Sequence, residues 1–287
     1  MTGYADLHLH TTASDGTLPP EELVALARKC GLSVISVTDH DTVAGLSEAK
    51  RAACDDVAFI PGVEFTSVYL GDGGSFRLHI LGYGIDPDSP ALLSVIDEGQ
   101  RIRRRKHSLR LEYLRDVHGI VFSDAELRLL ESESLVGKLH IAKLLIKRGL
   151  AENIGDAIEN FMSASDFPEG CIPHSLVIEG ITAAGGVSVY AHPLGGEGEK
   201  RLTFSEVSRR IELLSGSGIG GVECYYSRYS SGEAEYLALT AEKLGLLVSG
   251  GSDFHGKNKT VKIGELLSEG GKIKAERLSV LSRLVKY

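Results

Sequence analysis

Two histidines stand two residues apart in the segment Asp6-Leu7-His8-Leu9-His10, and Asp15 follows in the next loop. Side chains alternate between the two faces of a β-strand, so His8 and His10 are expected to present both imidazoles to the same place. The pair Asp253-Phe254-His255 repeats this spacing near the other end of the chain. Imidazole and carboxylate groups that converge in this way are typical ligands of a divalent metal.

Residues of the same kinds follow the other segments that are predicted to be strands. A single histidine at a strand end is usually a surface or core residue, but its recurrence at successive strand ends favours a metal centre. Histidine and carboxylate ligands without thiolates suit Mn²⁺, our first expectation, or Zn²⁺, Fe²⁺ or Mg²⁺. More donors are present than one ion can bind, so two or three ions are expected. The candidate ligands are His8, His10, Asp15, His40, Glu64, His79, His192, Asp253 and His255.

Strands and helices that alternate along the chain must position these residues. The clearest predicted helix follows Pro19-Pro20 and ends at Gly31, and Asp41 is expected to cap the next one. Alternation of this kind indicates parallel β/α units, and about seven strands suggest closure into a barrel, whose C-terminal strand ends share one rim. The predicted strands are Tyr4–His8, Ser33–Thr38, Val57–Glu64, Phe76–Tyr83, Gly186–Ala191, Gly220–Cys224 and Leu246–Gly250.

The alternation stops between about Pro90 and Phe167, where the pattern is helical throughout. We therefore expect a barrel domain formed by residues 1–89 and 171–287, and a helical insertion of residues 90–170 that covers the C-terminal rim. The Gly-Asp-Gly-Gly segment at residues 71–74 lacks the Gly-Lys-Ser/Thr ending of a P-loop, so it is predicted to be a tight turn between two strands.

Composition restricts the classes of function. The chain has 287 residues and a formal net charge of −8, which argues against binding to long duplex nucleic acid. Its four cysteines are far apart and form no Cys-x-x-Cys pair, which favours a reducing compartment. The sequence has neither a run of apolar residues long enough to cross a membrane nor a recognisable secretory leader, so we expect a cytoplasmic protein. Its oligomeric state is not predicted.

Six segments together carry a family resemblance: DLHLHTTASDG, SVTDHDTVAG, PGVEFTS, LHILGYG, GGVSVYAHP and SGGSDFHG. In this order they resemble the PHP (polymerase and histidinol phosphatase) superfamily of metal-dependent phosphoesterases. The chain is most similar to the stand-alone bacterial group of 3′,5′-nucleotide bisphosphate phosphatases and 5′-nucleases of short RNA. The resemblance implies a distorted (β/α)₇ TIM-like barrel, with the metals at its C-terminal rim.

The resemblance also implies how the ligands divide among the ions. His8, His10, Glu64 and Asp253 would hold the first metal. Asp15, His40 and His255 would hold the second. Glu64 would bridge to a third ion, which His79 and His192 complete. Asp6 lies outside this set, but it shares a strand face with His8 and could orient an imidazole.

The reaction expected at such a centre is hydrolysis of a phosphate ester. Three divalent ions outweigh the charge of three carboxylates, so the site stays positive and suits a phosphate group. A metal-bound water, with its pKa lowered toward roughly 7, can then attack phosphorus. Asp15, Glu64, His192 and Asp253 are accordingly the predicted catalytic residues, as ligands of the metals that activate water. The sequence contains no Gly-x-Ser-x-Gly elbow, which disfavours a serine hydrolase.

Substrate contacts are predicted partly from the insertion. Similar family members carry Gly-Arg-Pro-His-Ile-Ala, where this chain has Gly-Lys-Leu-His-Ile-Ala at residues 137–142. Lys138 keeps the charge of the family arginine but loses its planar fork. Lys138 and His140 are therefore candidates, with a solvated helix terminus as the alternative. His174, Tyr225 and Arg228 are further candidates because they lie after predicted elements that return to the rim.

Three functions are compatible with the sequence. The favoured one is a phosphoesterase for small nucleotides, such as 3′,5′-bisphosphonucleotides, or for the 5′ ends of short oligonucleotides. A phosphatase for a small metabolite such as histidinol phosphate would use the same metals with a different pocket. A non-catalytic metal-binding domain is disfavoured, because all nine ligand positions are filled.

Overall fold

The computed structural model describes residues 3–54, 56–131, 137–162, 171–197, 199–266 and 271–284. The chain divides into two compact units. The first, called the sheet unit, comprises Met1–Ile96 and Ile172–Tyr287, and the second, called the helical unit, comprises Asp97–Cys171.

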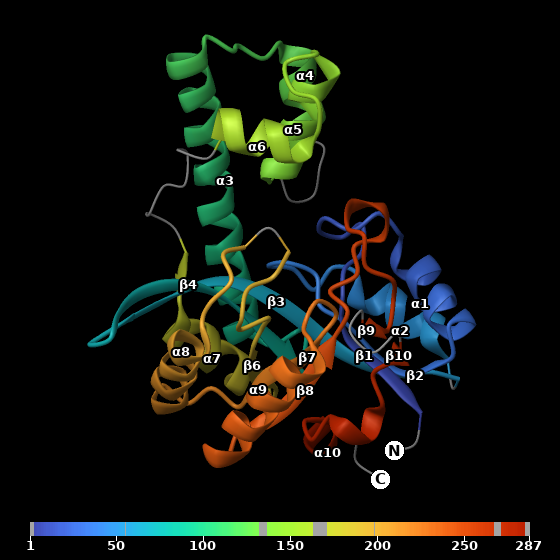
Figure 1. Ribbon diagram of the computed structural model, residues 1–287. Helices are drawn as coiled ribbons and strands as arrows, with labels where there is room; N and C mark the ends of the chain where they lie inside the picture. The colour runs from blue at the N-terminus through green and yellow to red at the C-terminus, as the bar shows by residue number, and fades with distance from the viewer. Residues whose placement is uncertain are drawn as a thin grey trace. The chain divides into compact units, whose positions relative to one another are not determined.

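The sheet unit is built on a mostly parallel sheet with the strand order β1-β2-β3-β4-β6-β7-β8, and β5 pairs with β3 (Figure 1). All seven predicted strands are present. Their ends differ from the prediction by at most two residues, except that β3 continues beyond Glu64 to Gly71. The β3–β4 and β4–β6 pairs are antiparallel and the other pairs are parallel. The strands are β1 (Tyr4–Leu9), β2 (Leu32–Val37), β3 (Ala58–Gly71), β4 (Gly74–Tyr83), β5 (Ile172–Pro173), β6 (Val187–Tyr190), β7 (Gly221–Tyr226) and β8 (Leu247–Gly251).

The antiparallel β3–β4 pair follows from the turn at residues 71–74. β3 ends at Gly71 and β4 begins at Gly74, whose φ of 101° lies in the left-handed region that glycine tolerates. Parallel strands need a connection of about a dozen residues or more, so a turn this short can join only antiparallel neighbours. The predicted turn is therefore confirmed, and it explains why the sheet is not wholly parallel.

Closure of the sheet into a barrel is not confirmed, because the paired strands among the described residues form a path from β1 to β8 rather than a ring. The two ends of the path nevertheless meet: Asp253 N donates to His8 O at 2.9 Å, and His10 N donates to Phe254 O at 3.0 Å. Gly251 permits this approach, since a Cβ added there would lie 2.3 Å from the Cβ of His8. The end of β1 is thereby fixed beside the segment that follows β8.

Helices pack against the strands of the sheet. Helix α7 contacts β3, β4 and β6, and α9 contacts β7 and β8. Helix α2 begins at Leu46 with Gly45 as its N-cap, so the predicted cap at Asp41 is wrong. Asp41 instead adopts a φ of 50°, and its Oδ1 accepts from Thr66 N at 3.3 Å. The helices are α1 (Pro20–Lys29), α2 (Leu46–Ala53), α7 (His174–Ala183), α8 (Phe204–Gly216), α9 (Ser231–Lys243) and α10 (Leu281–Leu284).

Short elements complete the C-terminal part of the sheet unit. They are the 3₁₀-helices η2 (Gly256–Asn258) and η3 (Ala275–Arg277), and a small antiparallel pair, β9 (Glu265–Leu266) with β10 (Gly271–Lys272). The core joins this part to the sheet, because Leu278 and Val280 pack in one buried cluster with Leu7, Leu81 and Val189. Burial of such side chains is the main stabilising contribution to the unit.

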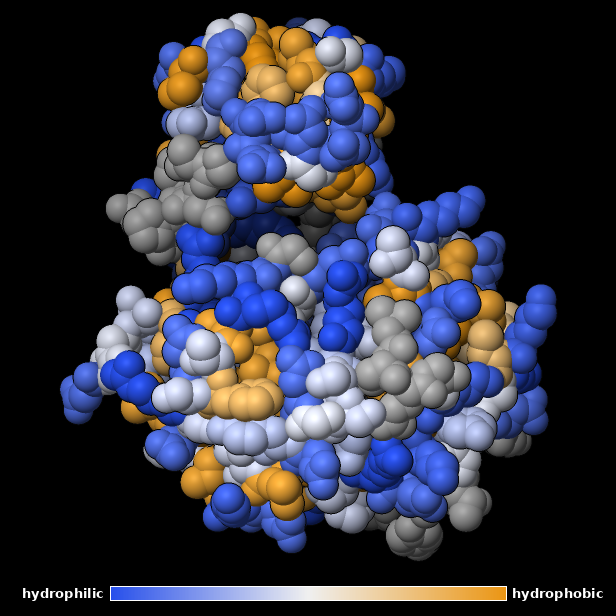
Figure 2. All heavy atoms as spheres, in the orientation of Figure 1, coloured by the Kyte–Doolittle hydropathy of each residue, from blue (hydrophilic) through white to orange (hydrophobic). Residues whose placement is uncertain are grey.

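The helical unit has a separate core. Its elements are the part of α3 (Pro90–His118) from Asp97 onward, α4 (Asp124–Glu131), α5 (Lys138–Lys147) and α6 (Ile154–Met162). Leu114, Ile141, Leu145 and Met162 belong to its buried cluster. Apolar groups also reach its surface in Figure 2, and Val121 is 65% exposed. None of the described helices has the length and apolar character needed to span a membrane.

Candidate metal centre

The nine predicted ligands come together around Glu64, whose side chain is 1% exposed. Each is contributed by the end of a strand, by the loop that follows it or, for Glu64 and His79, by the paired strands β3 and β4. Glu64 Oε2 lies 3.1–3.2 Å from nitrogens of His8, His10 and His40. Glu64 Oε1 lies 3.0 Å from His79 Nδ1 and 3.2 Å from His192 Nε2.

The other two carboxylates extend the cluster on either side of His10. Asp253 Oδ1 lies 3.5 Å from both His8 Nε2 and His10 Nε2. Asp15 Oδ1 lies 3.1 Å from His255 Nε2 and 3.7 Å from His10 Nδ1. His10 thus borders both the group that contains His8 and the group that contains Asp15.

The arrangement of the donor atoms suits binding of metal ions better than it suits hydrogen bonding among the side chains. His8 Nε2, both nitrogens of His10, His40 Nδ1 and Glu64 Oε2 are buried without a hydrogen-bond partner. Three imidazole nitrogens therefore face one carboxylate oxygen at close range but outside hydrogen-bond geometry. Buried polar groups without partners cost free energy, and a divalent ion among them would be a shared partner for all of these atoms.

Two glutamates that sequence reasoning missed, the buried Glu223 and the exposed Glu199, hold these imidazoles. Glu223 on β7 accepts from His8 Nδ1 at 2.9 Å through Oε1, and from His192 N at 2.7 Å through Oε2. Glu199 Oε2 lies 3.2 Å from His192 Nδ1. A carboxylate only accepts, so the proton of each imidazole is held on Nδ1 and Nε2 is left free to bind a metal. His255 is fixed in the same tautomer, because its Nδ1 donates to Asp253 O at 2.9 Å.

A register shift in β7 brings two polar side chains to the cluster. The pairing with β8 is irregular between Glu223 and Tyr225, so the strict alternation of sides is lost there. Glu223 reaches His8, and three residues later Tyr226 OH donates to Asp253 Oδ2 at 2.9 Å. An acid within the apolar strand Gly-Val-Glu-Cys-Tyr-Tyr is the sequence signal that could have identified Glu223.

Asp6 and Asp39 support the loops instead of the imidazoles. Asp6 accepts from Ser252 N at 2.9 Å and from Gly264 N at 2.7 Å, so it fastens β1 to the segment after β8. Burial raises the pKa of Asp6 to about 6, although these hydrogen bonds lower it. Asp39 accepts from Thr11 N at 2.8 Å and holds the loop that carries Asp15. The expected orientation of an imidazole by Asp6 is therefore replaced by contacts with backbone groups.

The protonation of the cluster follows from burial and from the neighbouring charges. Burial, together with the nearby His255, lowers the pKa of His10 to about 4, so this imidazole is neutral at pH 7. Burial opposes the charged form of Glu64, but His40, His8 and His79 bring the pKa of its carboxyl well below the usual value. Glu64 and His10 therefore offer a charged carboxylate and a neutral imidazole, which are the forms that bind metals.

Two of the candidate ligands have strained backbones. His192 has a φ of 28° and Asp253 a φ of 59°, both in the left-handed region that side chains other than glycine rarely adopt. Such conformations cost of the order of 1–3 kcal/mol each and concentrate at functional sites. The strain places both side chains at the same cluster.

Of the predicted substrate contacts, Arg228 lies close to this cluster. Its Nη1 is 3.1 Å from Glu197 Oε1, and Glu197 lines the same cavity as the ligands. Lys259, which sequence reasoning did not single out, also lines that cavity, and its Nζ lies 2.5 Å from Asp253 Oδ2. The full lining comprises His40, Glu64, His79, His192, Gly196, Glu197, Glu199, Asp253 and Lys259.

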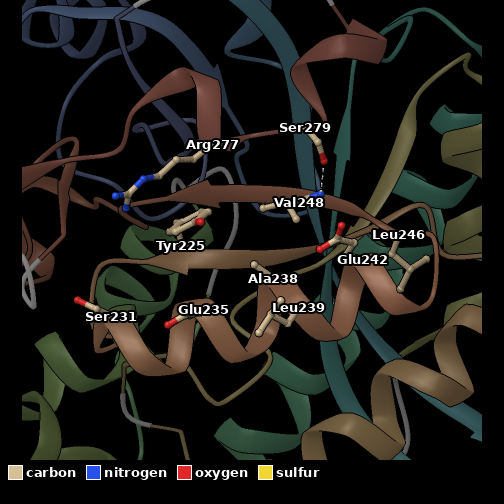
Figure 3. A pocket seen from close by; sticks show the side chains of 10 residues that line it. All are labelled: Tyr225, Ser231, Glu235, Ala238, Leu239, Glu242, Leu246, Val248, Arg277 and Ser279. Carbon is tan, nitrogen blue, oxygen red and sulfur yellow. Dashed lines mark hydrogen bonds between the residues drawn. The ribbon is translucent and has the colours of Figure 1, made fainter.

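His174 and Tyr225 have other surroundings. His174 Nε2 is 2.9 Å from Ser217 Oγ, and its ring packs on Tyr69 with the centroids 4.5 Å apart. Tyr225 lines a separate hollow between β7, β8 and α9, where Arg277 lies 5.5 Å from its ring centroid (Figure 3). Neither residue lines the cavity that His40, Glu64, His79, His192 and Asp253 border.

Lys138 and His140 lie in the helical unit, at the start of α5. His140 Nδ1 accepts from Gly137 N at 3.1 Å, so the imidazole closes the first turn of the helix. Their contact with substrate stays a prediction.

Comparison with known proteins gives the family. The PHP domain model matches residues 6–112. A 5′-3′ exoribonuclease of Haemophilus influenzae is 32% identical over 274 residues, which cover 93% of this chain and 95% of that protein. The chain belongs to the PHP family. A 3′,5′-nucleoside bisphosphate phosphatase of Chromobacterium violaceum is 31% identical over 260 residues, which cover 87% of this PHP protein and 86% of the relative.

Solved structures agree with this family. A candidate metal-dependent phosphoesterase of Bifidobacterium adolescentis matches with a TM-score of 0.80 and 30% identity, over 98% of this chain and 96% of that one. Relatives named as a phosphatase, an exoribonuclease and a phosphodiesterase are all phosphoric ester hydrolases. This PHP protein is accordingly a metal-dependent phosphoesterase.

Proposed function

We propose that this enzyme hydrolyses phosphate esters of small nucleotides, either 3′,5′-bisphosphonucleotides or the 5′ ends of short oligonucleotides. The observation that carries the proposal is the convergence of five imidazoles on the carboxylate of Glu64, with His8 held by Glu223. Asp15, Asp253 and His255 adjoin these imidazoles. The names of the two bacterial relatives, an exoribonuclease and a bisphosphate phosphatase, support nucleotides as the class of substrate.

Two or three divalent ions, with Mn²⁺ as the first choice, are proposed for the centre. Such ions supply Lewis acidity toward phosphate oxygens and lower the pKa of water. The geometry around Glu64 supports a shared ligand role for this carboxylate, because its two oxygens face different sets of histidines. The proposed sets are His8, His10, Glu64 and Asp253; Asp15, His40 and His255; and Glu64, His79 and His192.

The protein's own groups have three tasks in this proposal. Glu223 and Glu199 keep the Nδ1 protons on His8 and His192, so that the opposite nitrogens stay available to the ions. The hydrogen bonds that join His8 and His10 to residues 253 and 254 bring the first and last strands together, which supports closure as a distorted barrel. Lys138 and His140 of the helical unit are proposed to recognise a phosphate of the substrate, a role that their charge and donor groups allow.

The test compares substrates under one set of conditions. Phosphate release with MnCl₂ would be measured for 3′-phosphoadenosine 5′-phosphate, a short 5′-phosphorylated RNA, AMP and histidinol phosphate. We expect kcat/KM to be highest for one of the first two. A higher value for histidinol phosphate would replace the proposal with the small-metabolite phosphatase, and no release from any substrate would contradict it.

A pair of variants shows that the release comes from this centre. Asp15→Asn removes one candidate ligand and is expected to lower kcat/KM by at least about 100-fold. Mutation of residues that only hydrogen-bond to metal ligands already costs about 10- to 100-fold in metal affinity or activity. Asp72→Asn makes the same chemical change at an exposed position in the β3–β4 turn and should leave turnover unchanged.

A further inference from the structure

Lys259 directs a positive charge into the cavity of the metal centre. A lysine on a surface loop ordinarily extends its ammonium group into water. The side chain of Lys259 is only 21% exposed, and its Nζ lies 2.5 Å from Asp253 Oδ2. Among the described residues that line the cavity, it is the one lysine or arginine. The acidic residues that line the cavity are Glu64, Glu197, Glu199 and Asp253.

The loop that carries Lys259 is fixed to the loop that carries Asp15. Asn258 Nδ2 donates to Asp15 O at 2.7 Å, and Lys257 N donates to Thr17 Oγ1 at 3.0 Å. These contacts fix the last two residues of η2, which directly precede Lys259. The ammonium group therefore has a defined position relative to Asp15 and Asp253.

The contact with Asp253 does not by itself account for this placement. Asp253 Oδ2 already accepts from Tyr226 OH at 2.9 Å, which fixes the plane of the carboxylate. A lysine ammonium has three donors and no acceptor, so the hydrogen bond to Asp253 leaves donors for an oxygen that enters the cavity. A compact ammonium charge suits a phosphate oxygen. The neighbouring cation, Arg228, is paired with Glu197 at 3.1 Å.

We propose that Lys259 is a substrate-binding residue, whose Nζ donates to a non-bridging oxygen of the scissile phosphate. Its pairing with Asp253 is then the arrangement of the enzyme before substrate enters. This inference rests on the phosphoesterase function of the centre, but not on the choice of a nucleotide as substrate.

The test removes the charge and measures phosphate binding separately from turnover. Lys259→Met and Lys259→Gln remove the ammonium group, and Lys259→Arg keeps a cation. Lys257→Met is the matched control, because this neighbouring lysine is exposed and contributes its backbone N–H to Thr17. Calorimetry of the Mn²⁺-loaded protein would give the Kd of inorganic phosphate, mass spectrometry the manganese content, and steady-state kinetics kcat and KM.

Loss of a hydrogen bond between charged groups should raise the phosphate Kd and the substrate KM roughly 10- to 100-fold in Lys259→Met and Lys259→Gln. Manganese content should stay at the wild-type value, Lys257→Met should match wild type, and Lys259→Arg should recover part of the affinity. If the wild type releases no phosphate from nucleotides, the proposed substrate class fails, while the phosphate Kd still decides the role of Lys259.

Three results would overturn the inference. The first is an unchanged phosphate Kd in whichever of the two neutral variants folds, when both proteins are saturated with Mn²⁺. The second is a loss of manganese that fully accounts for the loss of phosphate affinity, since Lys259 would then act only by orienting Asp253. The third is absence of phosphate binding by the wild-type enzyme at millimolar concentrations.

Discussion

Replacing Glu223 with glutamine perturbs the metal centre without touching a candidate ligand. The carboxylate is fully buried, and each of its oxygens accepts one hydrogen bond, from His8 Nδ1 at 2.9 Å and from His192 N at 2.7 Å. The amide has nearly the same shape but only one oxygen. Glu223→Gln must therefore turn an NH₂ group toward one of two donors.

The two donors decide which way the amide of Glu223→Gln turns. The His192 N–H belongs to the backbone and cannot change, so the amide oxygen is expected to stay with it, and the NH₂ group faces His8. His8 then accepts at Nδ1 and carries its proton on Nε2, the nitrogen that lies 3.2 Å from Glu64 Oε2. A protonated Nε2 cannot bind a metal. Outer partners of this kind contribute roughly 10- to 100-fold in metal affinity, which equals about 1.4–2.7 kcal/mol.

Metal affinity and unfolding would be measured together. Calorimetry with Mn²⁺ gives the Kd of each protein, and denaturant unfolding with EDTA or with saturating Mn²⁺ gives the stabilisation that the metal provides. At equal free Mn²⁺, that stabilisation should be smaller in Glu223→Gln by about the same 1.4–2.7 kcal/mol, because binding to the native state adds to stability by mass action. Glu235→Gln, the same change at an exposed position on α9, is the control.

An unchanged Kd for Mn²⁺ in Glu223→Gln would refute this reasoning, since it would show that the tautomer of His8 does not depend on Glu223. A fall in stability that is equal with EDTA and with Mn²⁺ would also count against it. Such a result would assign Glu223 to the folding of the sheet alone.

Two further predictions concern the packing around the centre. In Gly251→Ala the new Cβ would lie 2.3 Å from the Cβ of His8, so the free energy of unfolding in urea should fall by about 1–3 kcal/mol or more. The control Gly232→Ala, whose new Cβ has no atom within 4 Å, should not destabilise the protein. Equal stabilities of the two variants would contradict the close approach of β1 and β8. Burial raises the pKa of the Cys224 thiol, so iodoacetamide at pH 8 should modify the exposed Cys54 and leave Cys224 unmodified until the protein unfolds. Peptide mass spectrometry would identify the modified cysteines. Early modification of Cys224 would mean that β7 is more accessible than the structure indicates.

The strands and the nine-residue cluster were predictable because both depend on short-range rules. Alternation along a strand puts His8 and His10 on one face, and the ends of parallel strands collect at one edge of a sheet. The nine residues that these rules selected lie together around Glu64. Sequence alone could not divide them among ions, because His10 borders two groups. Closure of the sheet was expected from strand number, which does not fix the pairing of the end strands.

The residues that sequence reasoning missed depend on irregular backbone. Glu223 and Tyr226 both reach the cluster because the pairing of β7 shifts between residues 223 and 225, and strict alternation would separate them. Lys259 reaches the cavity through loop contacts that no periodicity encodes. Tyr225, a predicted substrate contact, lies outside the lining of the ligand cavity and lines a different hollow.

Stability and metal affinity are built by different parts of the sheet unit. Leu7 belongs to the apolar cluster that packs Leu81 and Val189, while His8 in β1 and His10 directly after it carry buried nitrogens without hydrogen-bond partners. Such atoms destabilise the metal-free fold, and the apolar cluster must offset their cost. A divalent ion removes that cost, so the same atoms that weaken the fold without metal give the centre its affinity. The alternation of β1 thus places the source of stability and the demand for a metal on opposite faces of one strand.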